Sequence, residues 1–117
     1  MISSESARYL WDAKTAADDI LQFVAGRGLD DYLADKMLRA AVERQFAIIG
    51  EALVGLRRIN PDLAAAITDL QRIVAFRNVL VHAYGAVDDH LVWKIIEDNL
   101  PDLRATIERL LKDAPEP

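Results

Sequence analysis

Residues 77 to 84, which read Arg-Asn-Val-Leu-Val-His-Ala-Tyr, hold the side chains of this chain best suited to acid–base chemistry beside an anion. Histidine changes charge near neutral pH, which makes His82 a natural general acid or base. Arg77 supplies a permanent positive charge, with a planar set of donors that matches phosphate oxygens. A structural role is the alternative, because a charged histidine also suits a helix C-terminus, and Arg77 could pair with Glu43 or Glu51.

The expected geometry divides these side chains between two faces of one helix. Asn78 lies four residues before His82, so the two share a face. Arg77 lies five residues before His82, about 140° around an ideal helix, and aligns instead with Tyr84. Arg77 and His82 can therefore meet on one phosphate only if the helix end unwinds or a second chain contributes.

Two other titratable residues, His90 and Glu51, could belong to the site. His90, the second of the two histidines, falls in the first turn of an expected helix and is expected to lie on the surface. Glu51 is an acid within an apolar stretch, where a partly buried carboxylate needs a partner. We therefore include Glu51 as a supporting residue of the site and leave His90 out.

Neither a metal site nor a cofactor is expected. The Glu-x-x-His pairs of di-iron bundles are absent, since the residues three before each histidine, Val79 and Val87, are apolar. The chain has no cysteine, no His-Glu-x-x-His sequence and no glycine-rich phosphate loop.

The first half of the chain predicts two long helices. Apolar residues recur at helical spacing, and no segment alternates for long enough to make a strand. We expect one helix over about residues 5–25 and a second that begins after an N-cap at Asp30 and extends to about residue 56. Gly50 and Gly55 fall inside the second helix, where they cost helix propensity but permit close packing.

The second half of the chain contains more helix start and stop signals than the first half. The expected boundaries lie at Asn60-Pro61-Asp62, Thr68-Asp69, Gly85, Asp88-Asp89 and Pro101. The helix that carries the 77–84 segment then extends to about residue 83, and Pro101 kinks or breaks the last helix. The whole chain, 1–117, predicts one all-α domain with its core at about 5–112, an up-and-down bundle of four main helices plus a short helix.

Composition and charge narrow the classes of function. Apolar residues make up 52% of the 117 residues, as in ordinary globular domains. The N-terminus does not resemble a signal peptide, and no apolar run is long enough for a membrane span, so we expect a cytoplasmic protein without a membrane partner. The net charge of −5 counts against general nucleic-acid binding. Residues 37–82 are nevertheless net positive, with six arginines against four acids.

The 77–84 segment closely resembles the Arg-x4-His-x-Tyr motif of HepT-type toxins in the HEPN superfamily. Further segments similar to that family are Ala-Val-Glu-Arg-Gln-Phe at 41–46, Ile-Ile-Gly-Glu-Ala-Leu at 48–53 and Val-Trp-Lys-Ile-Ile at 92–96. The resemblance covers about residues 5 to 112, and the motif shows no departure that would mark an inactive copy.

This resemblance implies a HEPN-like helical homodimer that places two copies of the motif in one cleft. It implies the toxin of a type II toxin–antitoxin system, a metal-independent endoribonuclease with Arg77 and His82 as catalytic residues and Asn78 and Tyr84 in support. It also implies an RNA substrate and a minimal nucleotidyltransferase antitoxin, which would transfer AMP to Tyr84.

The implied reaction agrees with the chemistry of the residues. An RNA 2′-hydroxyl can attack the adjacent phosphate if a base accepts its proton, an acid protonates the departing 5′-oxygen and a cation stabilises the phosphorane. Two histidines from a dimer could provide the two proton transfers, and Arg77 the charge. The alternative function is a non-catalytic helical module that binds a nucleotidyltransferase partner or a nucleotide, which the negative net charge favours.

Overall fold

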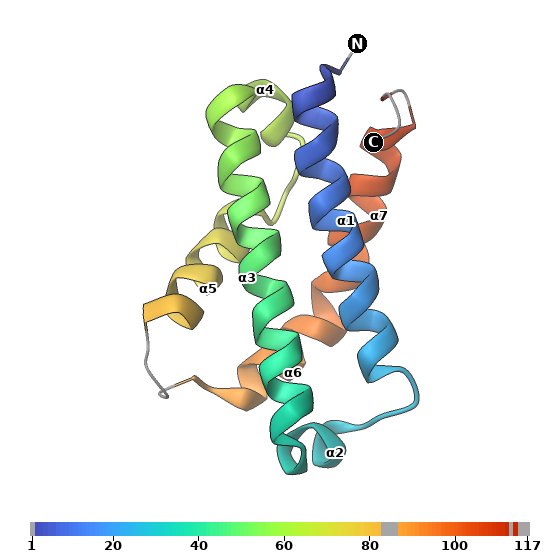
Figure 1. The fold of residues 1–117 in the computed structure, drawn as a ribbon, viewed down its shortest axis with the longest axis vertical. Coiled ribbons are helices and arrows are strands. Elements are labelled where there is room, and N and C mark those ends of the chain that lie inside the picture. Colours follow the sequence, from blue (N-terminus) through green and yellow to red (C-terminus); the bar gives the residue numbers. More distant parts are fainter. Residues whose placement is uncertain (1, 83–86, 113, 115–117) are drawn as a thin grey trace.

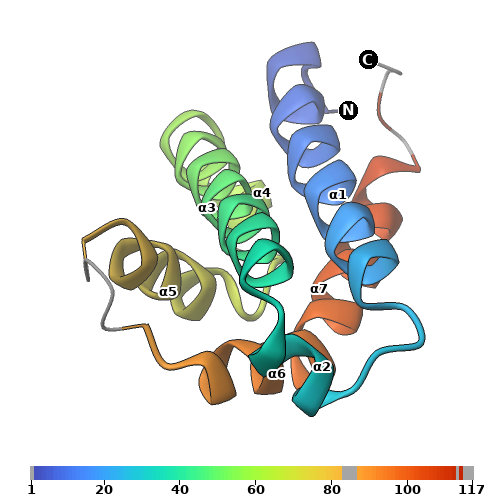
Figure 2. The same ribbon diagram turned by 60° about the horizontal axis from the view of Figure 1, so that its bottom comes forward.

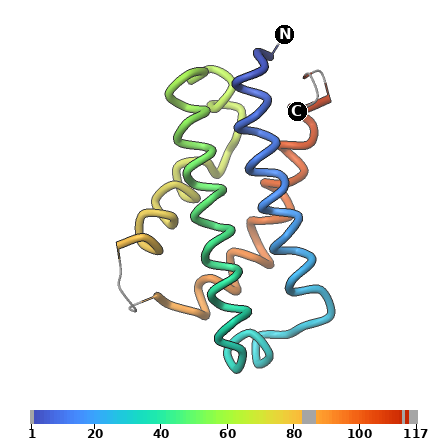
Figure 3. The backbone as a smooth tube through the Cα atoms, viewed as in Figure 1, coloured from blue at the N-terminus to red at the C-terminus, as the bar shows by residue number. Residues whose placement is uncertain are grey.

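The computed structural model describes residues 2–82, 87–112 and 114, and all of its regular structure is helical in these residues (Figure 1). Helices α1 (Ser4–Val24) and α3 (Lys36–Ile59) are the longest and pack side by side in opposite directions. Helix α7 (Leu100–Leu111) packs against α1, and α1 begins at the end of the bundle where α7 ends (Figure 3). The expected all-α fold is confirmed.

Four shorter helices complete the fold. Helices α2 (Leu29–Ala34) and α4 (Pro61–Ala64) lie at the two ends of α3. Helix α5 (Leu70–His82) packs against α3 and diverges from it toward the α5 C-terminus. Helix α6 (Asp89–Asp98) crosses behind the lower part of α3 in the view of Figure 1. Viewed from below, α3 separates α5 from α1, so α5 has an outer face free of the central helices (Figure 2).

The expected second helix is in fact two helices, divided at Asp35. The backbone of Asp35 is extended, and its carboxylate accepts a hydrogen bond from the amide of Leu38 at 3.0 Å, which starts α3. The expected N-cap at Asp30 is wrong: Gly28 is the N-cap of α2, and its amide donates to the Asp31 carboxylate at 2.8 Å. The N-cap of the long helix is therefore Asp35, five residues later than expected.

The later boundaries agree with the sequence signals. Asn60 caps α4 by accepting from the amide of Leu63 at 3.1 Å, with Pro61 in the first turn. Asp88 caps α6 in the same way, through the amides of His90 and Leu91. The break expected at Pro101 is confirmed, because α6 ends at Asp98 and α7 begins at Leu100. The expected stop at Gly85 lies outside the described residues.

One continuous core joins these helices. Phe46 of α3 meets Phe76 of α5 edge to face, with ring centroids 5.1 Å apart. Tyr32 of α2 lies against Trp93 of α6 at 5.5 Å. The first pair joins α5 to α3, and the second joins α2 to α6. The position of α5 is set mainly by its contact with α3. None of the described helices combines the length and the apolar character needed to cross a membrane.

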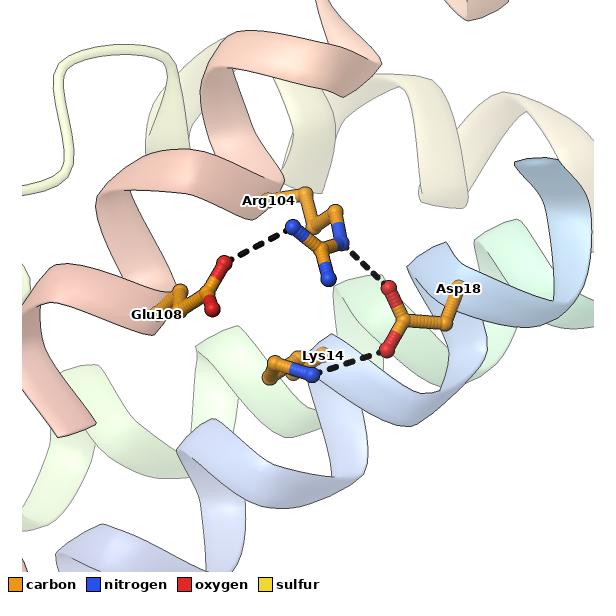
Figure 4. A network of polar contacts seen from close by, with 4 residues as sticks. All are labelled: Lys14, Asp18, Arg104 and Glu108. Atoms are coloured by element: carbon orange, nitrogen blue, oxygen red, sulfur yellow. Dashed lines mark hydrogen bonds and ion pairs between the residues drawn. The ribbon is translucent and has the colours of Figure 1, made fainter.

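A polar network holds α1 against α7 at the surface (Figure 4). Asp18 of α1 accepts from Lys14 at 2.9 Å and from Arg104 of α7, which also donates to Glu108 at 2.7 Å. Partial burial raises the pKa of Asp18, but the hydrogen bonds from Lys14 and Arg104 outweigh it, so the pKa lies below its usual value. Asp18 is therefore held in its charged form by the fold.

This lowered pKa predicts a small dependence of stability on pH. A carboxylate with a depressed folded-state pKa stabilises the protein above its usual pKa, and that contribution is lost as pH falls through the lowered value. We expect Asp18→Asn to reduce the free energy of unfolding by less than about 1 kcal/mol at neutral pH, since the Asp18 side chain is 37% exposed and solvent weakens its ion pairs. Urea unfolding at several pH values should show the difference from wild type shrinking in acid. A difference that grows in acid would contradict this account.

Candidate active site on helix α5

Helix α5 is held against α3 by one apolar face and by the stem of Arg77. Ile73, Val74 and Phe76 are buried on this side of the bundle. Farther along α5, the stem of Arg77 lies directly over Gly50 of α3. The two helices approach closely here because Gly50 has no side chain, so the glycine expected to permit close packing lies beneath a candidate catalytic residue.

The Arg77 guanidinium is held by two side chains. Its Nη2 lies 3.6 Å from Oε1 of Glu51, the residue that follows Gly50 on α3. Its Nη1 donates to Oδ1 of the adjacent Asn78 at 3.0 Å. The Nε atom is buried without a hydrogen-bond partner in the described part of the chain, while 26% of the side chain remains exposed. Arg77 is therefore oriented by Glu51 of α3 and by its neighbour Asn78, and its side chain is only partly buried.

Of the two acids considered as partners for Arg77, Glu51 makes the ion pair and Glu43 lies in a different group. Arg39 of α3 pairs with Asp89 at the start of α6 at 3.6 Å. Burial raises the pKa of Glu43, the Asp89 carboxylate raises it further, and Arg39 opposes both. These charges line a hollow of about 500 Å³ between the first half of α3 and the end of α5, formed by Lys36, Arg39, Ala40, Glu43, Leu80, Val81, Val87 and Asp89.

His82 is the last residue of α5 and is exposed to solvent. Asn78, one turn earlier, is exposed as well, which agrees with the expectation that the two share a face. The helix stays regular through His82, so it does not unwind between Arg77 and His82. Arg77 faces α3, and the described part of one chain does not bring its guanidinium onto the face of His82. Tyr84 lies outside the described residues.

Apolar side chains are exposed beside this segment. Val79 is 50% exposed, Val81 40% and Leu91, in the first turns of α6, 45%. A groove of about 390 Å³ separates α5 from α6, with Phe76, Val79, Leu91 and Ile95 among its lining residues. Large apolar side chains on a surface commonly mark a contact with another macromolecule.

Metal ligands do not gather in the described part of the chain. Within residues 2–82, 87–112 and 114, no three histidine, cysteine or acidic side chains lie close enough together to hold an ion. His90 lies on the surface in the first turn of α6, where the sequence predicts it.

Comparisons with known proteins agree with the motif. The family model described as "Ribonuclease HepT-like" matches residues 13–110. A Methanocaldococcus jannaschii protein named "Putative RNase MJ1380" is 32% identical over 102 residues, which cover 86% of this chain and 91% of that protein. A Thermococcus cleftensis protein named "Probable ribonuclease HepT" is 32% identical over 108 residues, covering 89% of this chain and 94% of that protein. No solved structure matches the chain significantly.

Proposed function

This chain belongs to the HepT-like ribonuclease family, and we propose that it is a metal-independent endoribonuclease with Arg77 and His82 as its catalytic residues. The observation that carries the proposal is the environment of the motif on α5. Glu51 and Asn78 hold Arg77 with 26% of its side chain exposed, and His82 ends the same helix in solvent. A fixed cation can stabilise the phosphorane of RNA cleavage by its own 2′-hydroxyl, and an accessible imidazole can provide one of its two proton transfers.

In the proposed reaction the 2′-oxygen of the RNA forms a bond to the adjacent phosphorus, and the bond from phosphorus to the 5′-oxygen breaks. One imidazole accepts the proton of the 2′-hydroxyl, and a second, protonated imidazole donates a proton to the departing 5′-oxygen. Arg77 donates to the non-bridging oxygens, where negative charge accumulates in the transition state. The products are a 2′,3′-cyclic phosphate and a free 5′-hydroxyl.

The regular course of α5 supports a site shared by two chains. Because the helix does not unwind before His82, Arg77 and His82 stay on different faces within one protomer. A two-fold dimer would place a second copy of each residue across the contact and supply both imidazoles. The exposed Val79, Val81 and Leu91 offer apolar surface for such a contact beside the motif.

Regulation through Tyr84 is part of the same proposal. The chain would act as the toxin of a type II toxin–antitoxin pair, with a minimal nucleotidyltransferase as its antitoxin. Transfer of AMP to Tyr84, two residues after His82 in the sequence, would add a bulky anion near the catalytic residues. That anion would repel the RNA backbone and occupy space that the substrate needs.

The decisive test is cleavage of RNA without metal. Purified protein whose Tyr84 is shown by mass spectrometry to be unmodified is incubated with total RNA in EDTA, and the product ends are analysed. We expect cleavage with 2′,3′-cyclic phosphate ends. If a confirmed dimer with unmodified Tyr84 leaves the RNA intact, the chain is instead a module that binds a partner or a nucleotide, the function that its net charge of −5 favours.

Subunit exchange tests whether the site is shared. Equal amounts of wild type and His82→Ala, mixed until their subunits have exchanged, give one quarter wild-type dimers. If one cleft needs both histidines, the mixture should keep about one quarter of the activity of the same total amount of wild type. If each protomer works alone, it should keep about one half. The measurement is the initial rate on one RNA substrate, and the higher value would exclude the shared site.

A further inference from the structure

We propose that Gly50 is a positioning residue for the cleavage of RNA. Its missing side chain leaves the space that the aliphatic stem of Arg77 occupies, and this contact sets where the guanidinium lies. The inference rests on the proposed ribonuclease function. Gly50 takes part in no chemical step and would act only through Arg77.

The contact between Gly50 and Arg77 is closer than any side chain at position 50 would allow. A β-carbon built on Gly50 would lie 2.3 Å from Cβ of Arg77, 2.4 Å from its Cγ and 3.3 Å from its Cδ. Gly50 is buried within α3, and its backbone is ordinary α-helix. The position therefore requires glycine for space and not for backbone freedom.

Adding a methyl group at position 50 has a definite geometric consequence. Ordinary van der Waals contact begins at 3.4 Å, so the stem of Arg77 would have to retreat by about 1 Å. The atoms that collide are Cβ and Cγ of Arg77. The position of Cβ is fixed by the α5 backbone, so rotation of the side chain alone cannot remove the collision. Within one protomer no other helix covers the side of α5 that faces away from α3 (Figure 2), so the protomer itself leaves room for α5 to shift away from α3.

The pair between Arg77 and Glu51 makes the site sensitive to such a shift. The Nη2–Oε1 distance is already 3.6 Å, and Glu51 is the next residue after Gly50 on the same helix. Moving α5 away from α3 moves Arg77 away from this partner. A displacement of about 1 Å in a group that must meet the transition state can lower a rate by as much as 100-fold.

Gly55 offers a matched control on the same helix. A β-carbon there would lie 2.3 Å from Cε1 of Tyr9, which is the same degree of overlap, but the collision is with α1. Gly50→Ala and Gly55→Ala therefore make the same chemical change in α3, and only the first displaces the helix that carries the motif.

The kinetic experiment compares these two variants with wild type on one RNA substrate in EDTA. We expect Gly50→Ala to lower kcat about 10- to 100-fold with little change in KM, because the substrate still binds while Arg77 is misplaced. Glu51→Gln should then have little further effect in the Gly50→Ala background. Gly55→Ala should keep the wild-type kcat per folded molecule, even if its melting temperature falls. Wild-type kcat in Gly50→Ala, or equal losses in both variants, would overturn the proposal.

Proton NMR tests the contact without any variant and without any activity. The unmodified protein should give nuclear Overhauser effects between the α-protons of Gly50 and the β- and γ-protons of Arg77, together with a slowly exchanging Nε–H of Arg77. Absence of both signals would refute the contact even if Gly50→Ala did not fold. If both signals are present but wild type cleaves no RNA, the proposed ribonuclease function fails while the contact itself stands.

Discussion

Replacing His82 by alanine is expected to abolish most RNA cleavage while leaving the fold intact. General acid–base catalysis by a positioned side chain contributes about 10²- to 10⁴-fold in rate, and in a shared site the substitution removes both imidazoles at once. His82 is exposed at the end of α5 and is not part of the core, so its removal costs little stability. We therefore expect kcat to fall by at least about 100-fold with an unchanged melting temperature.

His90 is the matched control for this experiment. It is the other histidine of the chain and is also exposed near a helix end, but it lies in the first turn of α6. His90→Ala should cleave RNA at the wild-type rate. If His82→Ala remains as active as His90→Ala, the acid–base role of His82 is wrong.

The sequence predicted the helices well where a local signal defined the boundary. Asn60-Pro61, Asp88 and Pro101 mark helix starts or breaks. Asn60 and Asp88 act through their own side chains, which accept from backbone amides two or three residues later, and the prolines act through their own backbone. The division at Asp35 was missed because an apolar stripe continues across it at helical spacing. Only the extended backbone and the carboxylate of Asp35 reveal that α2 and α3 are separate helices.

The motif supplied the candidate residues of the site, whose roles stay a prediction, but the sequence could not supply their geometry. The motif names Arg77 and His82, and helical spacing predicts that they lie on different faces. Which acid pairs with Arg77 depends on how α5 crosses α3, and that crossing is a tertiary property. Two glycines five residues apart look alike in the sequence, yet Gly50 receives Arg77 and Gly55 receives Tyr9. The partner of each could not be read from the sequence, because side-chain contacts between helices depend on the rotation and crossing of both.

Replacing Arg77 is expected to cause the second large loss of activity, and the size of the loss should depend on the shape of the new side chain. Removal of a group that stabilises transition-state charge typically costs about 10²- to 10³-fold in kcat. We expect Arg77→Ala to show a loss of this size. Arg77→Lys keeps the charge but loses the planar donor set and the contacts that Arg77 makes with Glu51 and Asn78, so it should recover only part of the rate.

Arg72 provides the control, because it also lies on α5 and is exposed to solvent. Single-turnover cleavage in EDTA by Arg77→Ala, Arg77→Lys and Arg72→Ala separates a specific role from a general loss of positive charge on α5. If charge alone mattered, Arg77→Lys would equal wild type and Arg72→Ala would lose activity. The proposed role requires the opposite order, with Arg72→Ala close to wild type and Arg77→Lys well below it, because the guanidinium of Arg77 acts by holding fixed donors against the phosphorane oxygens.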